Sequence, residues 1–202
     1  MKIKSAVFVK SAVKPGDFPS YGHPEIAFIG RSNVGKSSLI NMLLGRKDLV
    51  KVGGRPGVTT TINFFVVNDG ISIADLPGFG YAKLSQEKKS TFLPMIRRYL
   101  TGRGNISLVL LLVDARRIPG DFETDVITLL SELEKPVAII ATKCDKLSRN
   151  ELRSSIKEIA RVLEIESDAI FPSSSKNRQG RQELLGLIRE FASGHRGLPD
   201  AE

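Results

Sequence analysis

The residues best suited to chemistry lie at positions 30–37. They read Gly-Arg-Ser-Asn-Val-Gly-Lys-Ser and match the pattern G-x-x-x-x-G-K-[ST] of a phosphate-binding loop. Gly30 and Gly35 let the backbone approach a polyphosphate closely, Lys36 can reach its β- and γ-phosphates, and the Ser37 hydroxyl can ligate Mg²⁺. An apolar run precedes the loop and a helical pattern follows, which is the context that the motif requires. The predicted phosphate-binding residues are Gly30, Arg31, Ser32, Asn33, Val34, Gly35, Lys36 and Ser37.

A second motif, Asp75-Leu76-Pro77-Gly78, comes directly after the strand-like run 71–74. A carboxylate at the C-terminal end of a strand lies at the edge where ligands of open α/β sheets bind. We therefore expect Asp75 to hold Mg²⁺, directly or through water, and the N–H of Gly78 to contact a γ-phosphate. An isolated Asp could simply cap a turn, but its position 45 residues after Gly30, with a hairpin between, favours the metal role.

Two further segments end strand-like runs and could bind a purine base. The first is Thr142-Lys143-Cys144-Asp145. An ionised Asp145 can accept hydrogen bonds from N1–H and the amino group of guanine, whereas adenine would leave that carboxylate poorly paired. The stem of Lys143 can cover a face of the base, and Cys144 is a spacer. In the second segment, Ser173-Ser174-Ser175, a backbone N–H would contact guanine O6, although a serine-rich turn alone is only a turn.

Together these motifs predict a protein that binds GTP and GDP with Mg²⁺. The phosphate-binding loop alone would fit an ATP-dependent small-molecule kinase equally well, and this is the rival class. The segment from Thr142 to Asp145 argues against that rival because it is matched to guanine.

Alternating strands and helices must position these residues. Six strands are predicted, at 26–29, 62–67, 71–75, 106–113, 137–141 and 169–172. Asn68-Asp69-Gly70 is a hairpin signal, so the second and third strands should be antiparallel, while the strands separated by helices should be parallel. The predicted fold class is α/β, with a mixed six-stranded sheet, one antiparallel strand and helices on both faces. We expect an N-terminal lead-in at 1–24, one domain at 25–192 and a tail at 193–202.

Composition narrows the remaining possibilities. The chain has 202 residues, one cysteine, and no apolar run near the ~18 residues of a membrane span. A single cysteine cannot form an internal disulfide or a multi-cysteine zinc site. The N-terminus lacks the long apolar core of a signal peptide. We expect a cytosolic monomer with no membrane partner.

The net charge of +8 has two interpretations. Basic residues concentrate in the segments 30–56 and 81–104. They are Arg31, Lys36, Arg46, Lys47, Lys51 and Arg55 in the first segment, and Lys83, Lys88, Lys89, Arg97, Arg98 and Arg103 in the second. They form either a solvated surface or a surface for a polyanion, since phosphate neutralisation supplies non-specific nucleic-acid affinity. Charge alone does not choose between the two.

The order of the motifs resembles that of translation-factor-related GTPases with a Ras-like fold. Arg55-Pro56-Gly57-Val58-Thr59, Ile62-Asn63-Phe64-Phe65 and the run from Asp75 to Lys83 narrow the match, and they resemble the EngB (YihA/YsxC) family of bacterial GTPases. The resemblance covers roughly residues 5–192. It implies a Ras-like P-loop GTPase domain that hydrolyses GTP to GDP and phosphate as a molecular switch.

The resemblance also implies partners and a biological role. It suggests a part in large ribosomal subunit assembly, with ribosomal RNA or a large-subunit precursor binding the basic surfaces, and in normal cell division and septation. The alternative is a GTP-dependent signalling module that binds only protein partners in cell division.

Roles for individual residues follow from the same resemblance. Thr59 would be the switch-I metal ligand beside Ser37 and Asp75, but Thr60 follows directly, so the ligand could be shifted by one. The segment closing over the γ-phosphate would comprise Gly57, Val58, Thr59, Thr60 and Thr61. Lys36, Thr59 and Gly78 would act in hydrolysis. The guanine loops would be Thr142 to Asp145 and Ser173 to Ser175.

Three positions depart from common patterns of related GTPases. Thr142 replaces the Asn of N-K-x-D, and a hydroxyl supplies only part of an amide's hydrogen bonding. Phe79 stands where Ras-type enzymes hold a water-orienting Gln, which predicts slow intrinsic hydrolysis; Arg31 and Arg55 are candidates for stabilising charge in cis. Asn33 stands where Ras-type proteins commonly have Gly, which suggests K⁺ beside the phosphates, unless Asn33 simply bonds the loop backbone or a phosphate oxygen.

Overall fold

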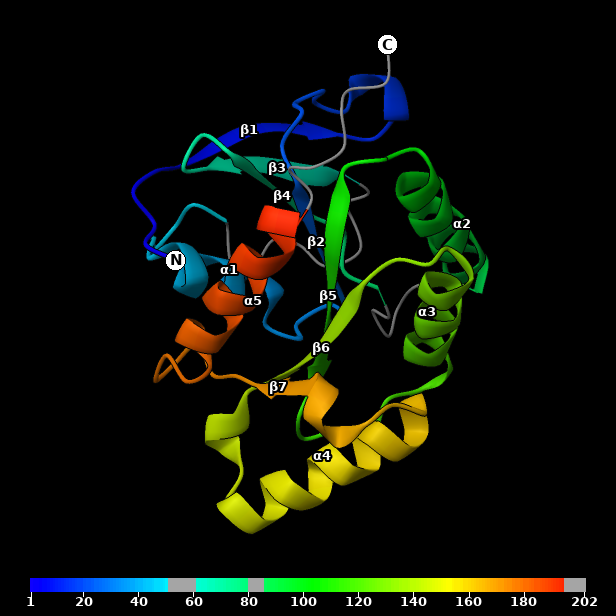
Figure 1. Ribbon diagram of the computed structural model, residues 1–202. Coiled ribbons are helices and arrows are strands. Elements are labelled where there is room, and N and C mark those ends of the chain that lie inside the picture. Colours follow the sequence, from blue (N-terminus) through cyan, green and yellow to red (C-terminus); the bar gives the residue numbers. More distant parts are fainter. Residues whose placement is uncertain (51–60, 80–85, 195–202) are drawn as a thin grey trace.

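The computed structural model describes residues 1–50, 61–79 and 86–194, with side chains for all of them except 86–90. A twisted sheet forms its centre and helices cover both faces (Figure 1). The strands are β1 (Ala6–Ala12), β2 (Glu25–Gly30), β3 (Ile62–Val67), β4 (Ile71–Asp75), β5 (Ile106–Asp114), β6 (Val137–Thr142) and β7 (Ile170–Pro172). The helices are α1 (Lys36–Leu44), α2 (Gln86–Thr101), α3 (Asp121–Glu132), α4 (Arg149–Leu163) and α5 (Arg181–Gly194), with short 3₁₀ turns at Pro15–Asp17, Cys144–Lys146 and Ser167–Ala169.

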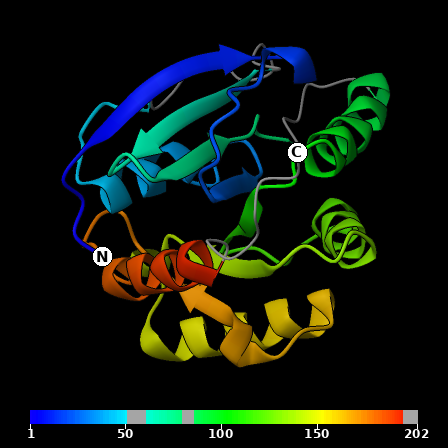
Figure 2. The same ribbon diagram turned by 45° about the horizontal axis from the view of Figure 1, so that its top comes forward.

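The sheet has the order β1-β3-β4-β2-β5-β6-β7. β3 is antiparallel to both β1 and β4, while every other neighbouring pair is parallel. The predicted class, the hairpin and the single reversed strand are therefore confirmed. The predicted number of strands is wrong, because the described residues alone form a sheet of seven strands. The missed strand, β1, is an edge strand that runs through the predicted lead-in and lies outermost in Figure 2.

Buried side chains on the two faces of the sheet form two hydrophobic clusters. Strand β5 contributes to both, since Val109 and Leu111 belong to one cluster and Leu110 and Leu112 to the other. Helices α2, α3 and α4 pack on the first face, and α1 and α5 on the second. Such burial on both faces explains the unbroken apolar sequence of the central parallel strand. Within the described part of the chain, no helix is long and apolar enough to cross a membrane.

A buried ion pair occupies the N-terminal end of β2. The guanidinium of Arg103 donates to the carboxylate of Glu25, with Nε 3.0 Å from Oε1. The Tyr99 hydroxyl donates to the same carboxylate at 2.6 Å. Burial raises the pKa of Tyr99 well above its ordinary value, so this hydroxyl keeps its proton. Arg103, counted in the basic segment 81–104, is thus a core residue and not part of a basic surface.

The opposite end of the sheet positions the predicted chemistry. Strands β2, β4, β5, β6 and β7 run parallel, so the loops that follow them meet at one edge. The predicted phosphate, metal and base motifs at 30–37, 75–78, 142–145 and 173–175 fall at these strand ends or on the loops that follow them.

Candidate nucleotide-binding site

The loop after β2 wraps around the start of α1. Asn33 and Gly35 have φ values of 63° and 109°, in the left-handed region that Gly adopts without strain. The N-cap of α1 is Gly35, which has no side chain with which to cap the helix, whereas α4 begins with a capping box of Ser148 and Glu151. The first N–H groups of α1 lack intrahelical acceptors, and an uncapped helix N-terminus of this kind is suited to an anion.

The predicted phosphate lysine and metal carboxylate are in direct contact. Asp75 ends β4 next to Phe28 of β2, and its carboxylate accepts a hydrogen bond from the ammonium of Lys36. Both side chains are largely buried, with exposed fractions of 11% for Lys36 and 5% for Asp75. Ser37 follows in the first turn of α1. The structure thus brings the two charged groups that would face phosphate and metal to one point.

The oxygen atoms of the Asp75 carboxylate and the Ser37 hydroxyl fit Mg²⁺ better than a metal that prefers nitrogen or sulfur. Among the described residues, no group of three or more His, Cys, Asp or Glu side chains could hold a metal ion. One carboxylate and hydroxyl groups match the way Mg²⁺ is held together with substrate phosphates.

Gly78 and Phe79 pack against the phosphate-binding loop. The N–H of Ser32 donates to the carbonyl of Phe79 at 2.6 Å, and the N–H of Phe79 donates to the carbonyl of Gly30 at 3.3 Å. A Cβ on Gly78 would lie 3.0–3.1 Å from atoms of Ser32, so a larger residue would require Ser32 to shift by a few tenths of an ångström. The Phe79 ring is 2% exposed and stacks on Phe122, with ring centroids 3.8 Å apart. It is therefore a side chain of the hydrophobic core, packed against other aromatic rings.

The predicted base-reading segment is hydrogen-bonded to the phosphate-binding loop. The hydroxyl of Thr142 lies 2.7 Å from the carbonyl of Val34 and 3.0 Å from that of Val113. It has one proton for two acceptors, as expected of a hydroxyl in place of an amide. The ammonium of Lys143 donates to the carbonyl of Asn33 at 2.6 Å. The two motifs therefore form one connected unit.

Asp145 is half-buried, with its carboxylate held by the serine-rich loop. The Ser174 hydroxyl donates to Oδ1 of Asp145 at 2.6 Å, and this bond lowers the pKa of Asp145 below its ordinary value. The carboxylate is thus ionised at neutral pH, as acceptance of two guanine donors requires. The N–H of Cys144 donates to the carbonyl of Ser173 at 3.2 Å, which joins the two loops directly.

The other residues of these two loops support the backbone. The thiol of Cys144 is buried, and burial raises its pKa. This placement agrees with the role of a spacer. Ser173 is fully buried, and its hydroxyl donates to the carbonyl of Gln179 at 3.1 Å, while Ser175 is half-buried. Arg181 ties the start of α5 to the end of α1 by donating to the carbonyl of Met42 at 2.8 Å.

Sequence reasoning missed three polar residues that position the site. Asp114 ends β5 and accepts from Lys143 at 2.9 Å and from Arg116 at 2.8 Å. Burial would raise the pKa of Asp114, but these hydrogen bonds outweigh it and hold that pKa well below its usual range. Its place at a strand end was the signal that could have identified it.

The other two missed residues lie on helices. Glu123 of α3 is buried, and its Oε1 lies 3.9 Å from Nη1 of Arg31. Asn41 of α1 holds Val50, because its side chain bonds both the carbonyl and the N–H of that residue, at 2.7 and 2.9 Å. Glu123 therefore restrains the phosphate loop's arginine, and Asn41 fixes the backbone just before residue 51.

Several predicted residues fall outside the described part of the chain. These are Gly57, Val58, Thr59 and Thr60 of the predicted switch I, and the basic residues Lys51, Arg55 and Lys83. Thr61 is described and directly precedes β3. Of the remaining predicted basic surface, Arg97 lies 2.5 Å from Glu132, so it too has an acidic partner. Arg46, Lys47 and Arg98 are exposed.

Comparison with known proteins decides the family. Residues 25–143 match the family model described as 50S ribosome-binding GTPase. The "Probable GTP-binding protein EngB" of Desulfatibacillum aliphaticivorans is 49% identical over 191 residues, covering 95% of this chain and 93% of the relative. The chain belongs to the EngB family of GTPases. The protein of the same description from Clostridium beijerinckii is 44% identical over 195 residues, covering 96% of this chain and 98% of the relative.

Solved structures agree with the EngB assignment. A crystal structure of a probable GTP-binding protein engB covers 84% of this chain and 99% of its own, with a TM-score of 0.70 and 30% identity. The cytosolic domain of the FeoB iron transporter of T. maritima, in a GDP form, has a TM-score of 0.54 and 27% identity, covering 88% of this chain and 66% of its own. The predicted EngB resemblance and P-loop GTPase fold are confirmed.

Proposed function

We propose that this EngB-family protein binds GTP with Mg²⁺, hydrolyses it to GDP and phosphate, and uses this cycle to control its association with the large ribosomal subunit during assembly. The observation that carries the proposal is the connection between the two halves of the site. Lys143 and Thr142 bond the loop of Asn33 and Val34, while Ser174 holds Asp145 ionised. Base and phosphates would therefore be read by one rigid unit.

The phosphates would lie along residues 30–37 and the uncapped start of α1. Lys36 would contact the β- and γ-phosphates, and Gly78 would donate its N–H to the γ-phosphate. Ser37, Asp75 and Thr59 would hold Mg²⁺. When bound, this ion would supply positive charge that offsets the negative charge of the phosphates. Water attacks the γ-phosphorus, the bond to the bridging oxygen breaks, and GDP leaves with phosphate.

Intrinsic hydrolysis is expected to be slow, below the ~1 s⁻¹ at the low end for enzymes. The position after Asp75-x-x-Gly78 carries a hydrocarbon ring that is stacked in the core, so it cannot orient the attacking water. Arg31, a candidate for stabilising charge in cis, already lies 3.9 Å from Glu123. A ribosomal particle or another partner would have to supply the missing stabilisation.

K⁺ is proposed as a second cation. The backbone carbonyl of Asn33 is taken by Lys143, but the side chain of Asn33 is exposed, so its amide oxygen can face a cation beside the phosphates. Such a cation would stabilise charge developing between the β- and γ-phosphates. Hydrolysis should be faster in K⁺ than in Na⁺ at equal ionic strength for wild type, and equal in both for Asn33→Ala. Equal wild-type rates would make Asn33 a structural residue.

The proposed function is tested by sedimentation with large ribosomal subunits in GTP, in GDP and without nucleotide. We expect association to differ between GTP and GDP and to weaken as salt rises. The rival is a signalling module with protein partners only. It predicts no association with ribosomal particles and salt-insensitive capture of cell-division proteins. We further propose that the protein is required for normal cell division and septation, whether its partner is the ribosomal subunit or a protein.

A further inference from the structure

We propose that the exposed face of α4 is the surface that binds the phosphate backbone of ribosomal RNA. This inference rests on the ribosomal partner of the proposed function and names the surface that meets it. Four basic residues recur at every fourth position of the helix, and all four are exposed. This α4 stripe consists of Arg149, Arg153, Lys157 and Arg161.

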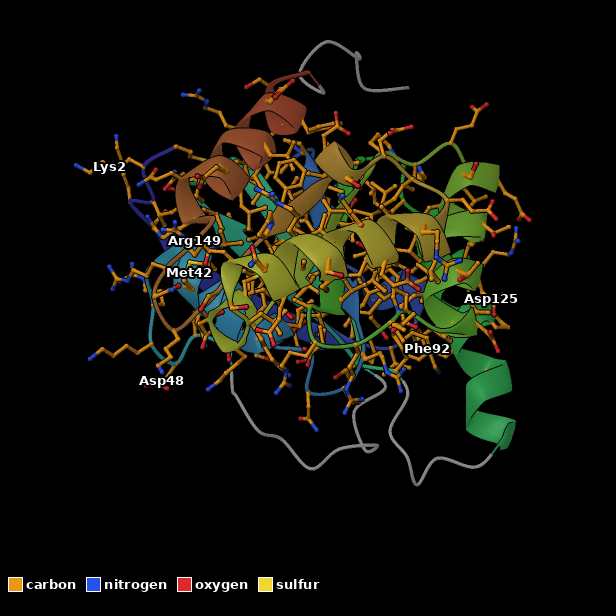
Figure 3. The ribbon with its side chains drawn as sticks, turned by 90° about the horizontal axis from the view of Figure 1, so that it is seen from below. Lys2, Met42, Asp48, Phe92, Asp125 and Arg149 are labelled. Carbon is orange, nitrogen blue, oxygen red and sulfur yellow. The ribbon has the colours of Figure 1, made fainter. Side chains whose placement is uncertain are left out.

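Helix geometry places the α4 stripe on one side. Residues four apart are neighbours on a helix surface, and the stripe extends for about 18 Å at ~1.5 Å per residue. The stripe turns by about 40° around the helix at each step, and the adjoining side of α4 is apolar, with Ile159 and Leu163 buried against the sheet. In Figure 3, α4 crosses the front of the molecule with Arg149 labelled beside one end. The helix thus binds the core with one face and presents cations on the other.

The acidic residues of α4 do not neutralise most of the stripe. The carboxylate of Glu151 accepts from the N–H of Ser148 at 2.7 Å, as part of the capping box. Glu158 pairs with Arg161 at 2.6 Å. In the part of the chain that the structure describes, Arg149, Arg153 and Lys157 form no ion pair within 4 Å. Three cations therefore remain for a partner.

Folding of the helix does not explain the first of these cations. Arg149 occupies the first helical position, after the N-cap Ser148. A cation at a helix N-terminus opposes the macrodipole and is unfavourable there. A folding role would favour an acidic residue there, so the placement of Arg149 points to a ligand outside the molecule.

The surroundings favour a polyanion over a protein. One strand of a duplex, with a phosphate for every ~3.4 Å of its helix axis, would present about five phosphates along the ~18 Å stripe. Protein interfaces are centred on aromatic and large apolar residues, and within the described residues none of the exposed large hydrophobics lies on α4. Lys146, also exposed, extends the positive charge towards Asp145. At the C-terminal end of α4 the basic stripe gives way to the acidic residues Glu164, Glu166 and Asp168. The stripe therefore begins next to the base-reading segment.

The decisive experiment compares two triple variants of the full chain. The first is Arg149→Gln/Arg153→Gln/Lys157→Gln. The control is Lys4→Gln/Lys10→Gln/Lys14→Gln, which removes the same charge from exposed residues of the β1 edge. The probes are protein-free large-subunit ribosomal RNA and intact large subunits, titrated between 50 and 300 mM KCl with GTP present. GTP affinity and the unfolding midpoint are measured for every variant.

Loss of three phosphate contacts should reduce the slope of log K against log salt by about 2–3, and weaken RNA binding on the order of 100-fold at 0.15 M salt. The control should bind like wild type, and both variants should keep wild-type GTP affinity. If both variants bind RNA like wild type, or if both lose the same affinity, α4 is not the docking surface. Either result would leave the proposed binding to the ribosomal subunit itself unaffected. If wild type itself binds neither probe, the proposed ribosomal function fails instead.

Discussion

The ring of Phe79 should matter for stability far more than for turnover. It is 2% exposed, stacks on Phe122 at 3.8 Å and approaches Phe92 at 5.7 Å between ring centroids. Truncating a buried Phe to Ala typically costs about 3–5 kcal/mol. Since ~1 kcal/mol shifts the melting temperature of a chain of this size by ~2–4 °C, Phe79→Ala should melt roughly 6–20 °C lower. Phe79→Leu, which fills most of the volume, should lose much less.

The assay is thermal and urea unfolding of wild type and both variants without nucleotide, followed by single-turnover GTP hydrolysis at a temperature where all are folded. We expect Phe79→Leu to hydrolyse GTP within about threefold of the wild-type rate, roughly 0.7 kcal/mol. The reasoning would be refuted if Phe79→Ala unfolded at the wild-type midpoint, or if folded Phe79→Leu lost hydrolysis altogether.

Three further predictions concern other contacts. Arg103→Met should destabilise the protein by about 3–5 kcal/mol in urea unfolding, because it leaves the Glu25 carboxylate buried without its cation. An additional Glu25→Leu change should recover part of that stability. An unchanged unfolding midpoint in Arg103→Met would contradict the burial argument. Ser174→Ala should weaken GTP binding about fivefold, near 1 kcal/mol, because Asp145 loses the hydroxyl that orients it, whereas equal affinities in a competition assay would remove Ser174 from the site. The preference for GTP over ATP should be constant from pH 5 to 8, because the pKa of Asp114 and of Asp145 is lowered in the folded protein. Ionisation of both carboxylates is then complete above the ordinary Asp value near ~3.9 and is lost only as the pH falls below it. The terminal phosphates of both nucleotides titrate alike, so a GTP-to-ATP preference that changes between pH 5 and 8 would contradict this.

Local patterns were sufficient to predict most of the fold. Strands such as 62–67 and 71–75 combine β-branched residues with a turn signal at Asn68-Asp69-Gly70, and the structure has both strands with the same bounds. β1 was missed because its partner strand, β3, lies far along the chain. An edge strand with polar residues such as Lys10 and Ser11 carries no strong periodic signal of its own.

Some contacts of the candidate site could likewise be predicted from the sequence and others could not. The contact of Lys36 with Asp75, and the closeness of Asp145 to the serine loop, follow from motifs placed at the ends of parallel strands. The restraint of Arg31 by Glu123 does not follow, since it depends on how α3 packs beside the loop. Charge was the least predictable property. A count of basic residues cannot distinguish Arg103, which is buried with Glu25, from the exposed Lys157.

The most direct test of the central claim is the base preference of Asp145→Asn. The carboxylate is half-buried and ionised, and it is held by Ser174 at the end of β6. Loss of two hydrogen bonds to a charged group should weaken GTP binding by at least ~100-fold, at about 1.5–3 kcal/mol each. Xanthosine triphosphate carries an oxygen at C2 that accepts from the new amide, so it should bind the variant more tightly than GTP does. Affinities for GTP, ATP and xanthosine triphosphate, measured by competition, decide the matter. The account predicts that preference reverses from GTP to xanthosine triphosphate, and a variant that still prefers GTP would contradict it.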